Sequence, residues 1–306
     1  MTSDIRRRRA VLLPLVLGVV GWSLASTLGA STQAADKTIF VSVVDNDLKP
    51  VKDIGAAEFG IREDSTVREV TSVKLATQPL FITVLADTSK VTGGGGFSAG
   101  STELIRDIRV SLTSFVRQIA AASPQSQISL MEFGQAAVTI TNFTSKTADL
   151  EKGINRLFPK SDAPSVLLEA IVEAGKNLGK KESLRRVIVA LNVEPSDEQS
   201  REPGQKIVDE LRKSGTQLWA VSLQKGPLRN PQRDVVLDVL TKNTGGRREF
   251  IMGQSAVETI LKGYADALVS QYEITYKRPA GASPQNVQVG VARPGLKLFA
   301  TVWPPQ

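Results

Sequence analysis

Two apolar runs, at residues 80–86 and 186–192, constrain the fold of this chain more than any other feature. Each is almost continuously hydrophobic, which is typical of a parallel strand buried on both faces. Around them, strand-like segments alternate with segments whose apolar residues have helical spacing, such as residues 101–121. This alternation predicts an α/β fold with a doubly wound, mainly parallel sheet and helices on both faces.

The same patterns predict the elements along the chain. In the α/β part we expect strands at residues 80–86, 127–133, 136–141, 186–192, 217–223 and 248–252. Helices are expected there at residues 101–121, 147–158, 165–179, 203–214, 231–242 and 255–269. Trp219 falls within one of these strands, and we expect it to lie in the core.

Both flanks of the α/β part are rich in strand patterns. The expected strands cover residues 38–44, 59–62, 67–75, 272–276, 287–291 and 298–302. Because isolated hairpins are rarely stable in water, we expect the flanks to meet in one small antiparallel module. The predicted division is an export signal at 1–35, an N-terminal β-rich flank at 36–78, the α/β domain at 79–269 and C-terminal strands at 270–306.

The N-terminal segment has the pattern of an export signal. Four arginines at residues 6–9 precede an uncharged, mostly apolar stretch at residues 10–28, and Thr32 and Ala34 have suitable spacing for cleavage. The alternative is an uncleaved anchor, since 19 uncharged residues almost span a bilayer. We therefore expect a periplasmic or secreted protein, or one anchored in the inner membrane by residues 10–28, with no other membrane contact.

The composition excludes several kinds of chemistry. The 306 residues include no cysteine and no histidine, which excludes disulfides, Ser-His-Asp triads and thiolate or imidazole metal sites. Any metal site must be built from oxygen atoms, which favours Mg²⁺, Ca²⁺ or Mn²⁺. The residues that most enzyme classes use are therefore missing, and we expect no enzymatic activity.

The charge does not indicate a nucleic-acid partner. The chain has 38 basic and 31 acidic residues, but four of the arginines lie in the expected signal and the other basic residues are scattered among acids. Lys180-Lys181 and Arg185-Arg186 are the densest basic stretch, and we interpret them as a solvated helix end.

Two stretches of the sequence, Leu85-Ala86-Asp87-Thr88-Ser89 and residues 240–247, each lie next to an expected strand. They resemble parts of a known family, the von Willebrand factor type A domain: the first is similar to its first metal-binding loop, DxSxS, and the second to the turn before its last strand. The flanks resemble a narrower group, the VWFA-related proteins described from acidobacteria. The stretches that carry this second resemblance are Val43–Val51, Glu58-Phe59, Arg62–Asp64, Tyr272–Tyr276 and Arg293–Leu296, so that the likeness covers residues 38–302.

The resemblance implies a metal site whose ligands are Asp87, Ser89, Ser165 and Asn192. The site departs from the family pattern, because Val91 replaces the second serine of the first loop and Asn192 stands nearest to a family aspartate. Lys90 would also repel a cation. Mg²⁺ is the cofactor that this site would take, but we expect a degenerate face that is metal-free or binds metal weakly.

For function, the resemblance implies an exported protein–protein interaction module whose partner is another protein. Two alternatives remain open. One is a nucleotide- or carboxylate-dependent enzyme that uses the same face, and the other is a structural envelope scaffold.

The features behind the enzyme alternative are weaker. In the Gly-rich loop at residues 93–100, Gly94, Gly96 and Ala99 formally fit a dinucleotide fingerprint, but the loop does not follow its strand directly and the expected downstream acid is missing. We expect a flexible surface loop. The acidic loop with Glu194, Asp197 and Glu198 is a candidate for Ca²⁺, and Asp87 with Glu194 is a candidate acid/base pair.

Overall fold

The computed structural model describes residues 34–89, 99–160, 162–225 and 230–305. The chain divides into two compact units, Met1–Gln33 and Ala34–Gln306, of which the second contains all the described residues. Residues 1–33 of the expected export signal, Lys90, Val91 and most of the Gly-rich loop lie outside the described residues, whereas Ala35 already belongs to the first strand. Among the described helices, none combines the length and hydrophobicity needed to cross a bilayer.

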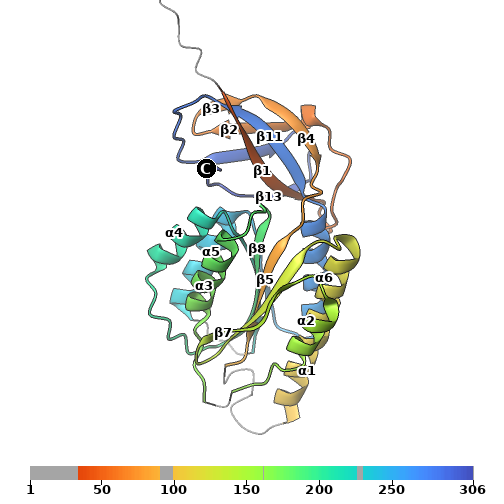
Figure 1. The fold of residues 1–306 in the computed structure, drawn as a ribbon, viewed down its shortest axis with the longest axis vertical. Coiled ribbons are helices and arrows are strands. Elements are labelled where there is room, and N and C mark those ends of the chain that lie inside the picture. Colours follow the sequence, from red (N-terminus) through yellow and green to blue (C-terminus); the bar gives the residue numbers. More distant parts are fainter. Residues whose placement is uncertain (1–33, 90–98, 161, 226–229, 306) are drawn as a thin grey trace, which may run out of the picture. The chain divides into compact units, whose positions relative to one another are not determined.

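A six-stranded sheet forms the centre of the second unit, in the order β10-β9-β8-β5-β6-β7 (Figure 1). All neighbours are parallel except β7, which runs antiparallel to β6 at the edge. The strands are β5 (Phe81–Asp87), β6 (Gln127–Phe133), β7 (Ala137–Thr144), β8 (Arg186–Glu194), β9 (Gln217–Gln224) and β10 (Arg248–Ile251). The two longest apolar runs are thus the adjacent central strands β5 and β8, as their burial on both faces requires.

Six helices cover the two faces of this sheet (Figure 1). They are α1 (Ala99–Ala122), α2 (Thr147–Ile154), α3 (Leu167–Gly179), α4 (Gly204–Ser214), α5 (Pro231–Thr244) and α6 (Ala256–Val269). Side chains of α1, α2 and α6 pack on one face, and those of α3, α4 and α5 pack on the other. Successive residues of β5 alternate between these layers: Val84 belongs to the first core and Leu85 to the second. The predicted doubly wound α/β fold is therefore confirmed.

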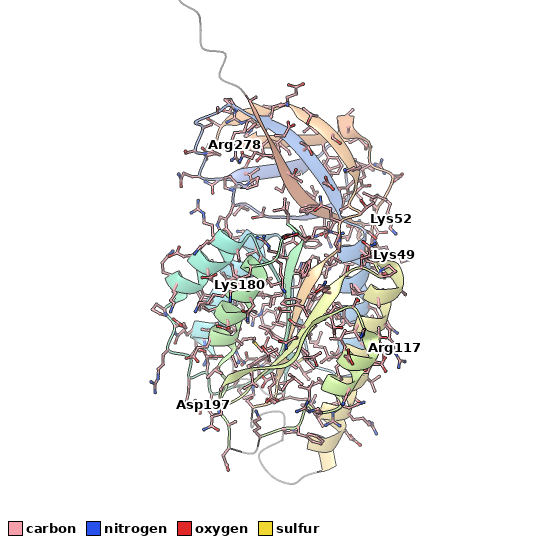
Figure 2. The ribbon with its side chains drawn as sticks, in the orientation of Figure 1. Lys49, Lys52, Arg117, Lys180, Asp197 and Arg278 are labelled. Carbon is pink, nitrogen blue, oxygen red and sulfur yellow. The ribbon has the colours of Figure 1, made fainter. Side chains whose placement is uncertain are left out.

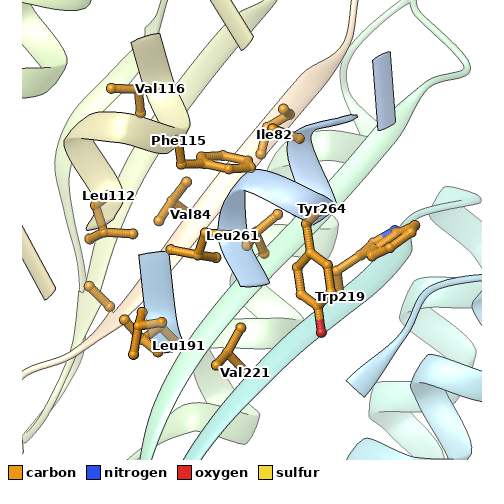
Figure 3. Close-up of a cluster of buried hydrophobic side chains, with 14 of the residues drawn as sticks. Ile82, Val84, Leu112, Phe115, Val116, Leu191, Trp219, Val221, Leu261 and Tyr264 are labelled. Atoms are coloured by element: carbon orange, nitrogen blue, oxygen red, sulfur yellow. The ribbon is translucent and has the colours of Figure 1, made fainter. Parts of the chain in front are cut away.

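The first core is centred on large side chains from α1, α6 and the sheet (Figure 3). Trp219 of β9 is 1% exposed, and its ring lies 5.0 Å from that of Tyr264 on α6 and 5.6 Å from that of Phe299. The Tyr264 hydroxyl donates a 2.8 Å hydrogen bond to the carbonyl of Ala220, which satisfies it in the interior. Trp219 therefore lies in the core, as its strand pattern predicted.

The two flanks pair with each other in two small antiparallel sheets. One has the order β13-β1-β11-β4 and the other the order β12-β2-β3, and their inner side chains share a third core. The strands are β1 (Ala35–Val44), β2 (Phe59–Glu63), β3 (Thr66–Arg68), β4 (Val70–Leu75), β11 (Tyr272–Arg278), β12 (Val287–Val291) and β13 (Lys297–Ala300), and a short 3₁₀ turn, η1 (Ala56–Glu58), precedes β2. We call these strands the β module.

Two of the sequence predictions were wrong in detail, one in the β module and one in the α/β part. The single strand expected at residues 67–75 is divided at Glu69, because β3 pairs with β2 whereas β4 pairs with β11 in the other sheet.

Arg185 and Arg186 are not a solvated helix end: Arg186 begins the central strand β8, and Arg185 is only 3% exposed. Its guanidinium donates to the carbonyls of Gln78 and Leu268, so tertiary packing buries a side chain that local sequence marks as exposed.

Candidate functional site

The loops at the carboxyl ends of the parallel strands form the candidate site. We call residues 87–89, 158–160, 163–166 and 192–200, with Met252 after β10, the carboxyl-end face. Figure 2 labels Asp197 on this face and Arg278 in the β module, at the opposite end of the second unit. Ligands of open α/β sheets bind at this edge because the strand ends and loops leave space there.

Asp87, the last residue of β5, is fully buried and held by its neighbours. Its Oδ1 accepts hydrogen bonds from the Ser89 amide at 2.9 Å and the Ser89 hydroxyl at 2.6 Å, and its Oδ2 accepts one from the Val193 amide at 3.0 Å. Burial raises the pKa of Asp87 above its usual value, while the positive charge of Arg233 and these hydrogen bonds oppose the rise. At the end of β5, the Asp87 carboxylate therefore acts as an internal hydrogen-bond acceptor.

Asn192 and Ser165, the other two predicted ligands, are also fully buried. Asn192 lies on β8 opposite Ser222 of β9, whose hydroxyl donates to the Asn192 Oδ1 at 3.0 Å. The Asn192 amide in turn donates to Glu194 at 3.1 Å. The main chain of Ser165 pairs with the acidic loop, through its amide to the Asp197 carbonyl at 2.8 Å and through a bridge to Glu198.

Arg233 of α5 fills the space between these residues, although it is not one of the predicted site residues. Its side chain is 0% exposed, and all five guanidinium N–H groups have acceptors. Nε and Nη2 donate to Glu194, Nη2 to the Val193 carbonyl at 3.2 Å, and Nη1 to the Ser165 hydroxyl at 2.9 Å and to Glu198 at 3.3 Å. The guanidinium therefore contacts Ser165 directly and also contacts Val193 and Glu194, which are hydrogen-bonding partners of Asp87 and Asn192.

The start of α5 positions this arginine. Asn230 caps the helix, accepting a 3.0 Å hydrogen bond from the Arg233 amide, and Pro231 occupies the first helical position. A cation in the first turn is unfavourable next to the positive end of a helix dipole, by about 0.3–1 kcal/mol. That mismatch, beside a loop with two glutamates, is the sequence signal that could have identified Arg233.

The four predicted ligands already have hydrogen-bonding partners within the protein. Mg²⁺ needs about six oxygen atoms in an octahedron, several of them anionic. Within the described ranges, no group of three acidic side chains has an arrangement that could hold a metal ion. The donor set therefore fits an internal guanidinium better than a divalent cation, and metal binding by Asp87, Ser89, Ser165 and Asn192 stays a prediction.

The two glutamates of the acidic loop also contact Arg233. Glu194 is 0% exposed, and the Glu198 side chain is 2% exposed; both face Arg233. Asp197 accepts a hydrogen bond from Gln199 at 3.1 Å. One carboxylate oxygen, Oε2 of Glu194, is buried without a hydrogen-bonding partner. Ca²⁺ binding by this loop and an Asp87–Glu194 acid/base pair have no further support in the described contacts.

Comparisons with known proteins give similarity at the level of the fold. No protein-family model and no curated protein sequence matches the chain. Among solved structures, proximal thread matrix protein 1 (PTMP1) from the mussel byssus superposes with a TM-score of 0.50 at 16% identity, over 62% of this chain and 48% of its own. The chain has a von Willebrand factor A-like fold.

Two further structures superpose with lower scores. The von Willebrand factor type A protein from Catenulispora acidiphila has a TM-score of 0.46 at 9% identity, over 88% of this chain and 74% of its own. BatB from Bacteroides thetaiotaomicron has a TM-score of 0.46 at 12% identity, over 61% of this chain and 98% of its own. The match to PTMP1 spans about half the length of that protein. At these identities the likeness concerns the fold alone, and the roles of individual residues need their own evidence.

Proposed function

We propose that this protein is an exported module that binds another protein through the carboxyl-end face, and that it does so without a bridging metal ion. The fold supports an interaction module, and the N-terminal charge pattern supports export. The proposal does not include a catalytic step, since the chain lacks histidine and cysteine and the buried Glu194 is paired with Arg233.

The buried guanidinium of Arg233 is the observation that carries this proposal. It places one positive charge beside Ser165, Glu194 and Glu198, where a bridging cation would have to bind. A second unit charge about 4 Å away would be repelled by about 4 kcal/mol at the effective dielectric constant of protein sites. A metal ion would therefore have to displace Arg233 before it could bridge to a partner.

The same face also exposes two large apolar side chains. Phe158, which follows α2, is 60% exposed, and the Arg109 guanidinium lies 4.4 Å from the centre of its ring. Met252, directly after β10, is 82% exposed. Aromatic, arginine and methionine side chains are enriched in protein interfaces, so this pair supplies the contact surface that a metal-free interface needs.

Metal independence is tested by thermal unfolding of the full chain. We expect the same midpoint in EDTA, Mg²⁺, Mn²⁺ and Ca²⁺, because the site already contains its cation. A ligand at about 100 times its Kd would stabilise the protein by about 2.7 kcal/mol, which is several degrees for a protein of this size. A shift of that size that disappears in Asp87→Ala would contradict the proposal.

Partner binding is tested by affinity capture from the envelope and secreted fractions of the source organism. We expect a partner that is retained in EDTA, lost with Phe158→Ala and kept with Val67→Ala. Val67 is a matched control, since it is 70% exposed but lies on β3 in the β module. A structural scaffold would give the opposite result, keeping its neighbours in Phe158→Ala and losing them when the β module is changed.

A further inference from the structure

A cavity lies at the amino ends of β8 and β9, at the end of the sheet opposite to the carboxyl-end face. It has a volume of about 330 Å³, which is within the usual range of small-ligand sites. Its walls come from the start of β1, the end of α4 and the segment after β13, and they include the apolar side chains of Phe40 and Trp303. Nothing in the proposed function uses this cavity.

Positive charge dominates the lining of the cavity. One lining residue, Asp36, is acidic, whereas five are basic: Lys37, Arg185, Arg186, Arg212 and Lys213. Asp36 is itself paired with Lys277 at 2.7 Å. Across the described stretches of the chain, none of the five cations has a carboxylate within ion-pair distance.

The two arginines at the start of β8 are held in place by main-chain carbonyls. Arg185 is 3% exposed and donates to the carbonyls of Gln78 and Leu268, and its burial lowers its pKa to about 10. Arg186 donates to the carbonyls of Ser214 at 2.7 Å and Lys181 at 2.5 Å. Its Nε is buried away from solvent and has no hydrogen-bonding partner among the described residues.

The negative ends of helix dipoles compensate only part of this positive charge. Arg212 and Lys213 lie in the last turn of α4, and Arg186 contacts the end of α4 and the residues that follow α3. The negative end of a helix dipole is equivalent to about half an elementary charge, so two helix ends balance about one of the five cations, and the negative charge of Glu273 acts on Arg185. The remaining positive charge is concentrated in a cavity with low-dielectric walls, which strengthens its attraction for anions.

We propose that this cavity is an anion-binding site that takes a carboxylate or phosphate group. Arg212 and Lys213 supply charged donors at the exposed rim, and Arg186 adds positive charge at the wall of the cavity. Charge-assisted hydrogen bonds from guanidinium groups suit both kinds of anion. The site lies away from the carboxyl-end face and does not depend on the partner proposed for that face.

The experiment is calorimetric titration of the full chain with inorganic phosphate and with citrate, at constant low ionic strength. We expect saturable binding of one anion per chain, weakened by added sodium chloride as screening increases. The double variant Arg212→Gln/Lys213→Gln should weaken binding about tenfold or more, since each lost contact is a hydrogen bond between charged groups. Lys206→Gln, which removes a charge from the exposed first turn of the same helix, should leave the affinity unchanged.

Each outcome either overturns the proposal or identifies the class of anion that the cavity binds. Binding of phosphate without citrate assigns the site to phosphate groups, and the reverse result assigns it to carboxylates. Failure of both anions to bind would overturn the proposal. Binding that is equally strong in the double variant would also overturn it, because the anion would then occupy another place.

Discussion

A single residue, Arg233, determines the chemistry of the candidate site. Its five hydrogen bonds connect α5 to the end of β8, to the loop after β8 and to the loop before α3. Buried charges are tolerated only when they are paired and hydrogen-bonded, and here two glutamates and a backbone carbonyl meet that requirement. The arginine and the acidic loop therefore depend on each other.

The first prediction concerns the loss of this arginine. Arg233→Met leaves Glu194 and Glu198 buried without their cation, and breaking a buried pair costs about 3–5 kcal/mol. We expect a loss of that size in chemical denaturation. In the same variant, Mg²⁺ or Ca²⁺ should raise the unfolding midpoint, because the acidic oxygens are then free to bind a cation.

The control adds Glu194→Gln to Arg233→Met, which removes the uncompensated charge along with the cation. We expect the double variant to recover part of the lost stability and to lose most of the metal response. If Arg233→Met unfolds at the wild-type denaturant concentration, the guanidinium is not the cation that holds this face together.

At the scale of elements, the β module is held by a buried ion cluster as well as by its core. Glu63 of β2 is 1% exposed and accepts hydrogen bonds from Arg278 at 2.8 Å and from the Tyr276 hydroxyl at 2.6 Å, both on β11. Arg68 of β3 donates to its other oxygen at 2.9 Å. One carboxylate therefore joins strands from both flanks and from both small sheets.

The second prediction is a dependence of stability on pH that arises from Glu63. Burial alone would raise its pKa, but hydrogen bonds from Arg278, Tyr276 and Arg68 outweigh this effect and lower it. Because the folded pKa lies below the unfolded one, this stabilisation is complete above the unfolded pKa of about 4.3 and is lost as the pH falls through the folded pKa. Denaturation series between pH 7 and pH 3 would measure it.

Glu63→Gln should remove this pH dependence and cost about 3 kcal/mol at pH 7, since Arg278 then loses its buried partner. Glu58→Gln is the matched control, because Glu58 pairs with Arg293 at the surface, where water and salt screen the pair. An equal loss in both variants would show that burial of Glu63 has no special effect.

At the scale of the whole second unit, the C-terminal segment joins the β module to the α/β domain. Gly245, at the end of α5, has φ +78° and lies against the backbone at the end of β13: an added Cβ would be 2.3 Å from the Thr301 nitrogen. The Val302 amide also donates to the Asn243 carbonyl at 2.9 Å. Only glycine permits both the left-handed conformation and this close approach.

The third prediction compares two glycines with the same left-handed backbone. Gly215→Ala should cost about 1 kcal/mol, because its φ is +62° but no atom lies within 4 Å of the new Cβ. Gly245→Ala should cost about 2–5 kcal/mol, since the steric overlap with Thr301 adds to the same backbone strain. Thermal unfolding of both variants measures the difference, and equal losses would show that the joint is not tightly packed.

The sequence determined the α/β architecture because hydrophobic periodicity is a local property. The apolar runs that became β5 and β8, and the helical spacing that became α1, were recognisable without knowledge of their neighbours. The same local patterns placed Asp87, Ser165 and Asn192 near one edge of the sheet, since the ends of parallel strands meet there.

Only the tertiary structure decided what these residues contact. Arg233 reaches Glu194 and Ser165 across 39 and 68 positions of sequence, and Arg185 is buried by carbonyls more than 80 positions away. Burial, charge compensation and the partners of a polar group depend on such distant segments, and a local pattern carries no information about them. The sequence therefore defined the framework and its polar edge, whereas the folded structure determined that an arginine occupies the centre of that edge.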